Sequence, residues 1–171
     1  MSFIAGSSRD VRIRDYRRRF VPTLSTLLTS LLALLPIVVT TPIIPDLAFL
    51  VLLSWRLLRP EIWPAQAALP LGLFNDFVAG HPLGQSMALW TILFLVCDYV
   101  DSRLGFRDYW MDWLLAALAV TLYVIAGWYI AALMGSQIRL SVLWPQIALS
   151  ILVYPIVARL VLALDRWRLA R

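Results

Sequence analysis

Residues 113–134 have the sequence WLLAALAVTLYVIAGWYIAALM, in which no side chain carries a charge. An α-helix needs about 20 consecutive apolar residues to cross the hydrocarbon core of a bilayer. This stretch is long enough, so it predicts a membrane-spanning helix.

The rest of the chain has the same apolar character. It is 61% hydrophobic and 15% charged, and its mean hydropathy is +0.81. A soluble domain is about 45–50% apolar and about 25% charged. A soluble protein of 171 residues could not bury so much apolar surface in one core, whereas lipid covers the outer faces of helices in a bilayer. We therefore expect an integral membrane protein.

Further apolar stretches predict an all-α, polytopic fold with six transmembrane helices. The expected spans are residues 21–40, 43–58, 62–78, 85–100, 113–134 and 142–164. They form one domain, residues 21–171, which follows a basic head at residues 1–20. No small-residue cleavage site follows the head, so the first apolar stretch is expected to be a retained helix rather than a signal peptide.

The basic residues predict how this domain is oriented. All 15 of them are arginine. With six spans and both ends in the cytoplasm, every arginine except Arg139 lies on the cytoplasmic side. This agrees with the rule that the cytoplasmic loops of membrane proteins carry an excess of basic residues. The basic segments are expected to contact anionic lipid. Nucleic-acid binding is not expected, because aromatic residues interleaved with base-reading side chains are absent.

Catalytic residues are scarce, since the chain has one histidine, His81, and one cysteine, Cys97. His81 lies in an outer turn and Cys97 near the inner end of the fourth span, so most of a membrane thickness separates them. A Ser/His/Asp or Cys/His set would have to include His81, and none can be assembled. We expect no enzymatic activity, no cofactor and no metal centre.

Carboxylates are concentrated between the fourth and fifth spans, at Asp98, Asp101, Asp108 and Asp112. Asp98 and Asp101 are three residues apart, and Asp108 and Asp112 are four apart, so the members of each pair could share a helix face. Four carboxylates together could bind a divalent cation. The pattern faintly resembles the Asp-rich signature of membrane CDP-alcohol phosphotransferases, but Ser102 stands where that family has glycine. The favoured interpretation is a solvated loop in which Arg103 and Arg107 balance the acids.

Asn75 and Asp76 stand near the end of the third span, just before a turn made by Gly80, Pro82 and Gly84. A buried, unpaired carboxylate costs several kcal/mol in a membrane. One interpretation is a polar notch that faces a partner or a small cavity. The other, slightly favoured by position alone, is an interfacial carboxylate that reaches water or caps the next turn. Gln66 is the only other strongly polar residue expected nearby.

Residues 72–84, GLFNDFVAGHPLG, resemble the hallmark of the MreD family of rod-shape-determining membrane proteins. The pattern there is Gly-x-x-x-Asp-x-x-x-Gly-x-x-Leu-Gly, and it is matched here by Gly72, Asp76, Gly80, Leu83 and Gly84. Pro45-Asp46, Val142-Leu143-Trp144 and Tyr154-Pro155 resemble other parts of the family. The resemblance covers most of the chain from about Pro45 onward.

The resemblance implies a non-enzymatic role in the elongasome, the complex that builds side-wall peptidoglycan in the bacterial inner membrane. It implies binding to MreC, and through MreC contact with MreB, RodA and its partner transpeptidase. The residues expected to receive MreC are Asn75, Asp76, Gly80, Leu83 and Gly84. The family is also thought to resemble the substrate-binding subunits of energy-coupling-factor (ECF) vitamin transporters, so such a subunit is the alternative function.

Overall fold

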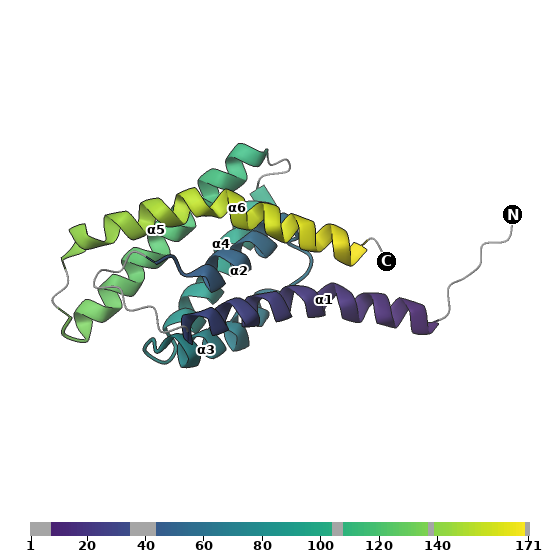
Figure 1. The fold of residues 1–171 in the computed structure, drawn as a ribbon, viewed down its shortest axis with the longest axis horizontal. Helices are drawn as coiled ribbons and strands as arrows, with labels where there is room; N and C mark the ends of the chain where they lie inside the picture. The colour runs from purple at the N-terminus through teal and green to yellow at the C-terminus, as the bar shows by residue number, and fades with distance from the viewer. Residues whose placement is uncertain (1–7, 35–43, 104–107, 137–138, 170–171) are drawn as a thin grey trace, which may run out of the picture.

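The computed structural model describes residues 8–34, 44–103, 108–136 and 139–169. These residues are helical without strands, which confirms the all-α part of the prediction. The helices pack against one another in one bundle (Figure 1). The elements are α1 (Ser8–Leu31), η1 (Leu32–Leu34), α2 (Leu47–Leu58), η2 (Ala65–Ala67), α3 (Ala68–Ala79), α4 (Gln85–Arg103), α5 (Tyr109–Leu133), η3 (Leu140–Leu143) and α6 (Trp144–Leu169).

The predicted head and first span meet within one helix, because α1 begins at Ser8 and continues to Leu31. Residues 1–7 of the head and residues 35–40 of the predicted span lie outside the described residues. A hydrogen bond links the middle of α1 to the bundle: the indole nitrogen of Trp55 donates to the Ser25 hydroxyl at 2.9 Å.

Helix α2 occupies the centre of the bundle (Figure 1), and every residue from Ala48 to Leu57 is buried. Its sequence, LAFLVLLSWRLL, is apolar on all sides except at Ser54 and Arg56, and a helix apolar on all sides is stable only when it is surrounded. The Asp46 side chain begins the helix by accepting the Phe49 backbone N–H at 3.0 Å. Pro60 follows shortly after the last residue of the helix. A proline disfavours helical geometry in the residue before it, so Pro60 prevents the helix from continuing.

Helices α2 and α3 are shorter than the spans predicted at 43–58 and 62–78. Each has 12 residues, which corresponds to about 18 Å at about 1.5 Å per residue, whereas the hydrocarbon core of a bilayer is about 30 Å thick. The difference has a local cause. Asp46 sets the start of α2, and the segment that contains Pro60 and Pro64 delays the start of α3 until Ala68.

Helices α5 and α6 are long and apolar, and the stretches Tyr109–Leu133 and Leu140–Arg168 could each cross a membrane by length and composition. Their large apolar side chains are mostly at the surface, including Leu118, Leu122, Leu152, Ile156 and Leu160. Several charged and amide groups lie inside the bundle, since Arg56, Asn75 and Asp76 are at most 2% exposed. A soluble protein seldom exposes apolar patches of this extent.

Helices α3 and α4 form a hairpin in which the two backbones approach closely, and Gly72 permits this approach. A Cβ atom at this position would lie 2.6 Å from the backbone nitrogen and Cα of Met87 in α4. Real Cβ atoms do not approach backbone that closely, so any other residue would push the two helices apart. Gly72 is thus required by packing rather than by its backbone angles.

We expect Gly72→Ala to lower the free energy of unfolding by about 1–3 kcal/mol, the usual cost of overpacking. Thermal unfolding of the purified protein in a mild detergent measures the effect. Gly127→Ala is the matched control, because its added Cβ meets only the end of the Gln85 side chain, at 3.2 Å. Equal melting temperatures for the two variants would contradict this account.

Candidate functional site

The Asp76 carboxylate lies at the first turn of α4 and is 1% exposed. Its two oxygens accept the backbone N–H groups of Gly84 at 2.9 Å and Ser86 at 2.8 Å, and more weakly that of Met87 at 3.5 Å. The first N–H groups of a helix have no partner within the helix, and the helix dipole favours a negative charge there. Asp76 therefore caps α4 from the neighbouring helix, which is close to the capping role that position alone favoured.

The turn between α3 and α4 is built on two glycines with left-handed backbone angles. Gly80 ends α3 with a φ of 71°, and Gly84 precedes α4 with a φ of 94°. Side chains other than glycine rarely adopt such angles. Leu83, between them, is 69% exposed. The five residues matched to the family pattern thus cluster at one hairpin, and Leu83 is the one with an exposed side chain.

Ser86 connects this hairpin to other polar side chains. Its hydroxyl accepts a hydrogen bond from the Asn75 amide at 3.2 Å and lies 3.3 Å from His81 Nδ1. It also lies 3.5 Å from the hydroxyl of Tyr123 in α5. The Tyr123 hydroxyl donates in turn to Asp46 Oδ2 at 2.8 Å. A chain of hydrogen bonds therefore joins α3, α4, α5 and the start of α2.

Ser86, His81 and Asp76 come together, but they lack the geometry of a hydrolytic triad. In a triad the two ring nitrogens of the histidine contact different partners. Here the Ser86 hydroxyl at 3.3 Å and the Asp76 oxygen at 4.0 Å both lie against Nδ1 of His81. Ser86 is also fully buried, so a substrate could not reach it.

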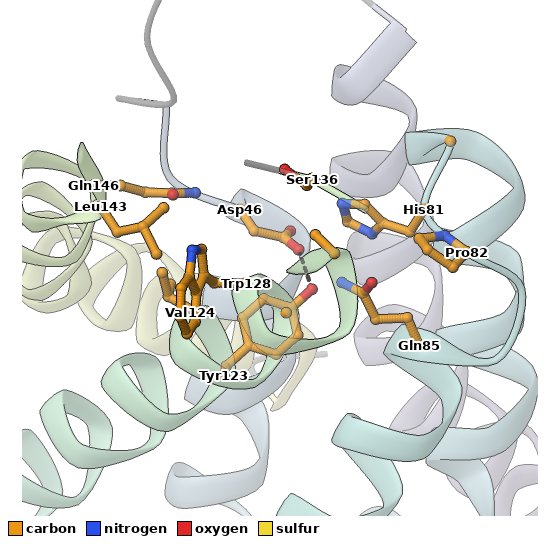
Figure 2. A pocket seen from close by; sticks show the side chains of 13 residues that line it. Asp46, His81, Pro82, Gln85, Tyr123, Val124, Trp128, Ser136, Leu143 and Gln146 are labelled. Atoms are coloured by element: carbon orange, nitrogen blue, oxygen red, sulfur yellow. Dashed lines mark hydrogen bonds between the residues drawn. The ribbon is translucent and has the colours of Figure 1, made fainter. Parts of the chain in front are cut away.

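A cavity of about 280 Å³ opens beside this network. Figure 2 shows Asp46, Tyr123, Gln85 and His81 converging on it, with Trp128 on the opposite side. Residues from the start of α2, the α3–α4 turn, α5 and the start of α6 line it together. Gln66 is not part of this group, because it is exposed in η2 at the far end of α3, so the expected cluster of Gln66 with Asn75 and Asp76 does not form.

At the other end of the bundle, Arg56 of α2 is buried, with its side chain 1% exposed. Its guanidinium pairs with Asp98, lies 3.1 Å from Asp101, and stands over the Phe94 ring at 5.7 Å from the centroid. Both carboxylates belong to α4, which continues to Arg103 instead of ending near residue 100. Asp98 lies within the predicted span, and the extra turn places Asp101 on the same face, which meets α2.

The expectation that Arg103 and Arg107 balance the acids of this segment did not include Arg56, which pairs with both Asp98 and Asp101. Arg103 lies over the Tyr99 ring, 5.4 Å from its centroid, and Arg107 lies outside the described residues. Across the described ranges, no three His, Cys, Asp or Glu side chains are grouped so that they could hold a metal ion.

Asp165 of α6 adds a second ion-pair group at this same end and is 4% exposed. It pairs with Arg59 at 2.9 Å and with Arg168. The Arg168 guanidinium also stands over the Trp55 ring, 5.4 Å from its centroid. Sequence reasoning missed the roles of Asp46, Ser86, Tyr123, Arg56 and Asp165. Only Asp46 had a local signal, as a capping residue immediately before an apolar stretch.

The described bundle has an apolar core in which ion pairs and hydrogen-bonded carboxylates are buried, and its outer faces are apolar as well, which is the arrangement that helical membrane proteins have. The chain belongs to the MreD family: the family model described as rod shape-determining protein MreD matches residues 16–163. The family description gives it a role in cell shape. No curated protein and no solved structure matches the chain.

We expect Asp76→Ala to lower the free energy of unfolding by about 2 kcal/mol or more. The change leaves the buried N–H group of Ser86 and the part-buried N–H group of Gly84 without an acceptor, and a buried group of this kind costs about 1–3 kcal/mol. Thermal unfolding in detergent measures the effect. The control is Asp108→Ala, because Asp108 is exposed and makes no side-chain capping bond to α5; its effect should stay within about 0.5 kcal/mol. A similar loss in both variants would rule out the capping role.

Proposed function

We propose that this protein is a non-enzymatic, multi-pass component of the elongasome in the bacterial cytoplasmic membrane. In this role it binds MreC and helps maintain rod shape and side-wall peptidoglycan synthesis. Through MreC it communicates with MreB, with RodA and with its partner transpeptidase. The observation that carries the proposal is the match to the MreD family over residues 16–163.

The proposed topology has six spans with both ends in the cytoplasm. It is supported by how charges divide between the two ends of the bundle. Arg56, Arg59 and Arg168 meet at one end, which the positive-inside rule assigns to the cytoplasm. The glycine turn and the cavity lie at the opposite end, which then faces the periplasm. The basic residues at the cytoplasmic end and in the head are proposed to contact anionic lipid.

A cysteine-accessibility experiment tests this topology. Cys97 is the one cysteine of the sequence, so Cys97→Ala gives a background for single cysteines. We expect a membrane-impermeant maleimide to label Leu140→Cys in spheroplasts and Asp108→Cys only after lysis, since both positions are exposed but lie at opposite ends. Labelling of Asp108→Cys in intact spheroplasts would refute the six-span topology.

The proposed contact with MreC is the α3–α4 turn, with separate roles for its residues. Asn75 and Asp76 are each 1% exposed, so neither side chain is available to a partner. They hold the turn together with Gly80 and Gly84, while Leu83 presents an apolar side chain at the periplasmic end. An exposed leucine in an ordered turn can be buried by a partner at about 1.5–3 kcal/mol.

We expect Leu83→Asn to reduce recovery of MreC several-fold when the protein is purified from membranes in mild detergent. The matched control is Leu133→Asn, because Leu133 is 71% exposed near the same end of the bundle but outside the turn. The variants should have similar melting temperatures, which separates contact from folding. Full recovery of MreC with Leu83→Asn would count against the turn, and no recovery with the unmodified protein would count against the proposed function itself.

A substrate-binding subunit of a vitamin-type transporter is the second candidate function. The cavity beside Asp46 and Tyr123 favours it, because it is lined by several polar side chains. Its volume of about 280 Å³ is at the lower limit of small-molecule sites, which usually occupy about 300–1,000 Å³. A vitamin found by mass spectrometry in the purified protein would favour transport.

A further inference from the structure

The cavity at the periplasmic end, called here the outer pocket, contains a carboxylate that has no cationic partner among the described residues. Asp46 accepts the Phe49 N–H through Oδ1 and the Tyr123 hydroxyl through Oδ2. Both of these donors are neutral, and each carboxylate oxygen can accept a further hydrogen bond. Within the described residues, no arginine forms an ion pair with Asp46. The charge of an ionised Asp46 is therefore not balanced by any described arginine.

The opposite end of the bundle treats its carboxylates differently. Asp98 and Asp101 share Arg56, and Asp165 lies between Arg59 and Arg168. The bundle thus pairs its carboxylates with cations at one end, whereas Asp46 at the other has only neutral donors. A partly buried charge is stabilised most by an opposite charge close to it, so the outer pocket is suited to a cation supplied from outside the chain.

The other walls of the outer pocket suit an organic cation. Trp128 provides an indole ring, and cations are attracted to the face of such a ring. The Gln146 amide nitrogen donates to the Ile44 carbonyl at 3.3 Å, so the amide oxygen of Gln146 remains an acceptor. Gln85 provides a second amide, which makes no hydrogen bond within the described part of the chain. Val124 and Leu143 supply apolar surface for a hydrocarbon stem.

We propose that the outer pocket binds an organic cation, a guanidinium or alkylammonium group that pairs with Asp46 and lies against Trp128. The volume of about 280 Å³ accommodates such a group with its short stem. Two sources carry this chemistry: the side chain of an arginine or lysine in a periplasmic partner, and a small free amine. The proposal does not depend on MreC, because the pocket lies entirely within this chain.

The first test compares two probes that differ in charge and hardly in shape. N-acetyl-arginine amide carries a guanidinium, and N-acetyl-citrulline amide carries a neutral urea in its place. Binding of each to the full chain in detergent is followed by saturation-transfer NMR and titration calorimetry. We expect the arginine probe to bind about tenfold or more tightly than the citrulline probe. Equal binding of the two probes, or binding of neither, would overturn the proposal.

The second test locates the site. Asp46→Asn keeps an oxygen for the Phe49 N–H and removes the charge, so we expect it to weaken binding of the arginine probe about tenfold or more. Trp128→Leu should weaken it about threefold or more. Asp108→Asn, an exposed carboxylate at the other end, should leave it unchanged. Unaltered binding by an Asp46→Asn protein that melts normally would overturn the proposal. Should that variant not fold, Trp128→Leu decides the location.

A competition experiment separates the two sources of the cation. The arginine probe is added at saturating concentration to the full chain with MreC bound. Release of MreC identifies a basic side chain of that partner as the occupant, whereas retention of MreC with the probe bound identifies a free amine or another partner. If MreC is not recovered at all, the proposed function fails while the probe titrations still decide the outer pocket.

Discussion

The Asp76 carboxylate fixes how the second half of the described bundle is attached to the first. It sits on α3 but satisfies the backbone N–H groups at the start of α4. Since those groups have no acceptor within their own helix, the bond sets both the position and the direction of α4. The position of Ser86 follows from it, and so do the hydrogen bonds from Ser86 to Asn75 and toward Tyr123. Gly72 makes this possible by letting the two helix backbones approach.

The two ends of the bundle solve the same problem of burying polar groups in different ways. At one end charge meets charge, with Arg56 almost fully enclosed between α2 and α4. At the other end the carboxylates of Asp46 and Asp76 are satisfied by backbone N–H groups and a tyrosine hydroxyl. Ion pairs of this kind resist separation, because removing one partner leaves a buried charge. The hydrogen-bonded end retains capacity for a further interaction, which is where the outer pocket lies.

Sequence predicted the parts of the fold that depend on local composition. The helices now seen as α4, α5 and α6 follow from long apolar stretches, and the turn after α3 follows from Gly80 and Gly84. The short length of α2 and α3 was not predicted, because apolar residues precede the actual start of each helix, Ile44 before α2 and Ile62 and Trp63 before α3. Asp76 was identified as a candidate, but its acceptor role was one of several interpretations. Which backbone groups it would meet depends on how α3 packs on α4. The pairing of Arg56 with Asp98, 42 residues apart, had no local signal at all.

Helix α3 has a consequence for the surrounding lipid. It is about 18 Å long at about 1.5 Å per residue, and Leu73 and Phe77 on its surface are exposed. In a bilayer, a short lipid-facing helix creates hydrophobic mismatch, and the membrane thins beside it at a modest cost for each ångström. That cost falls when a second short or tilted segment shares the thinned region. With the proposed topology, the membrane itself therefore draws such neighbours toward the α3 side of the protein before any specific contact forms.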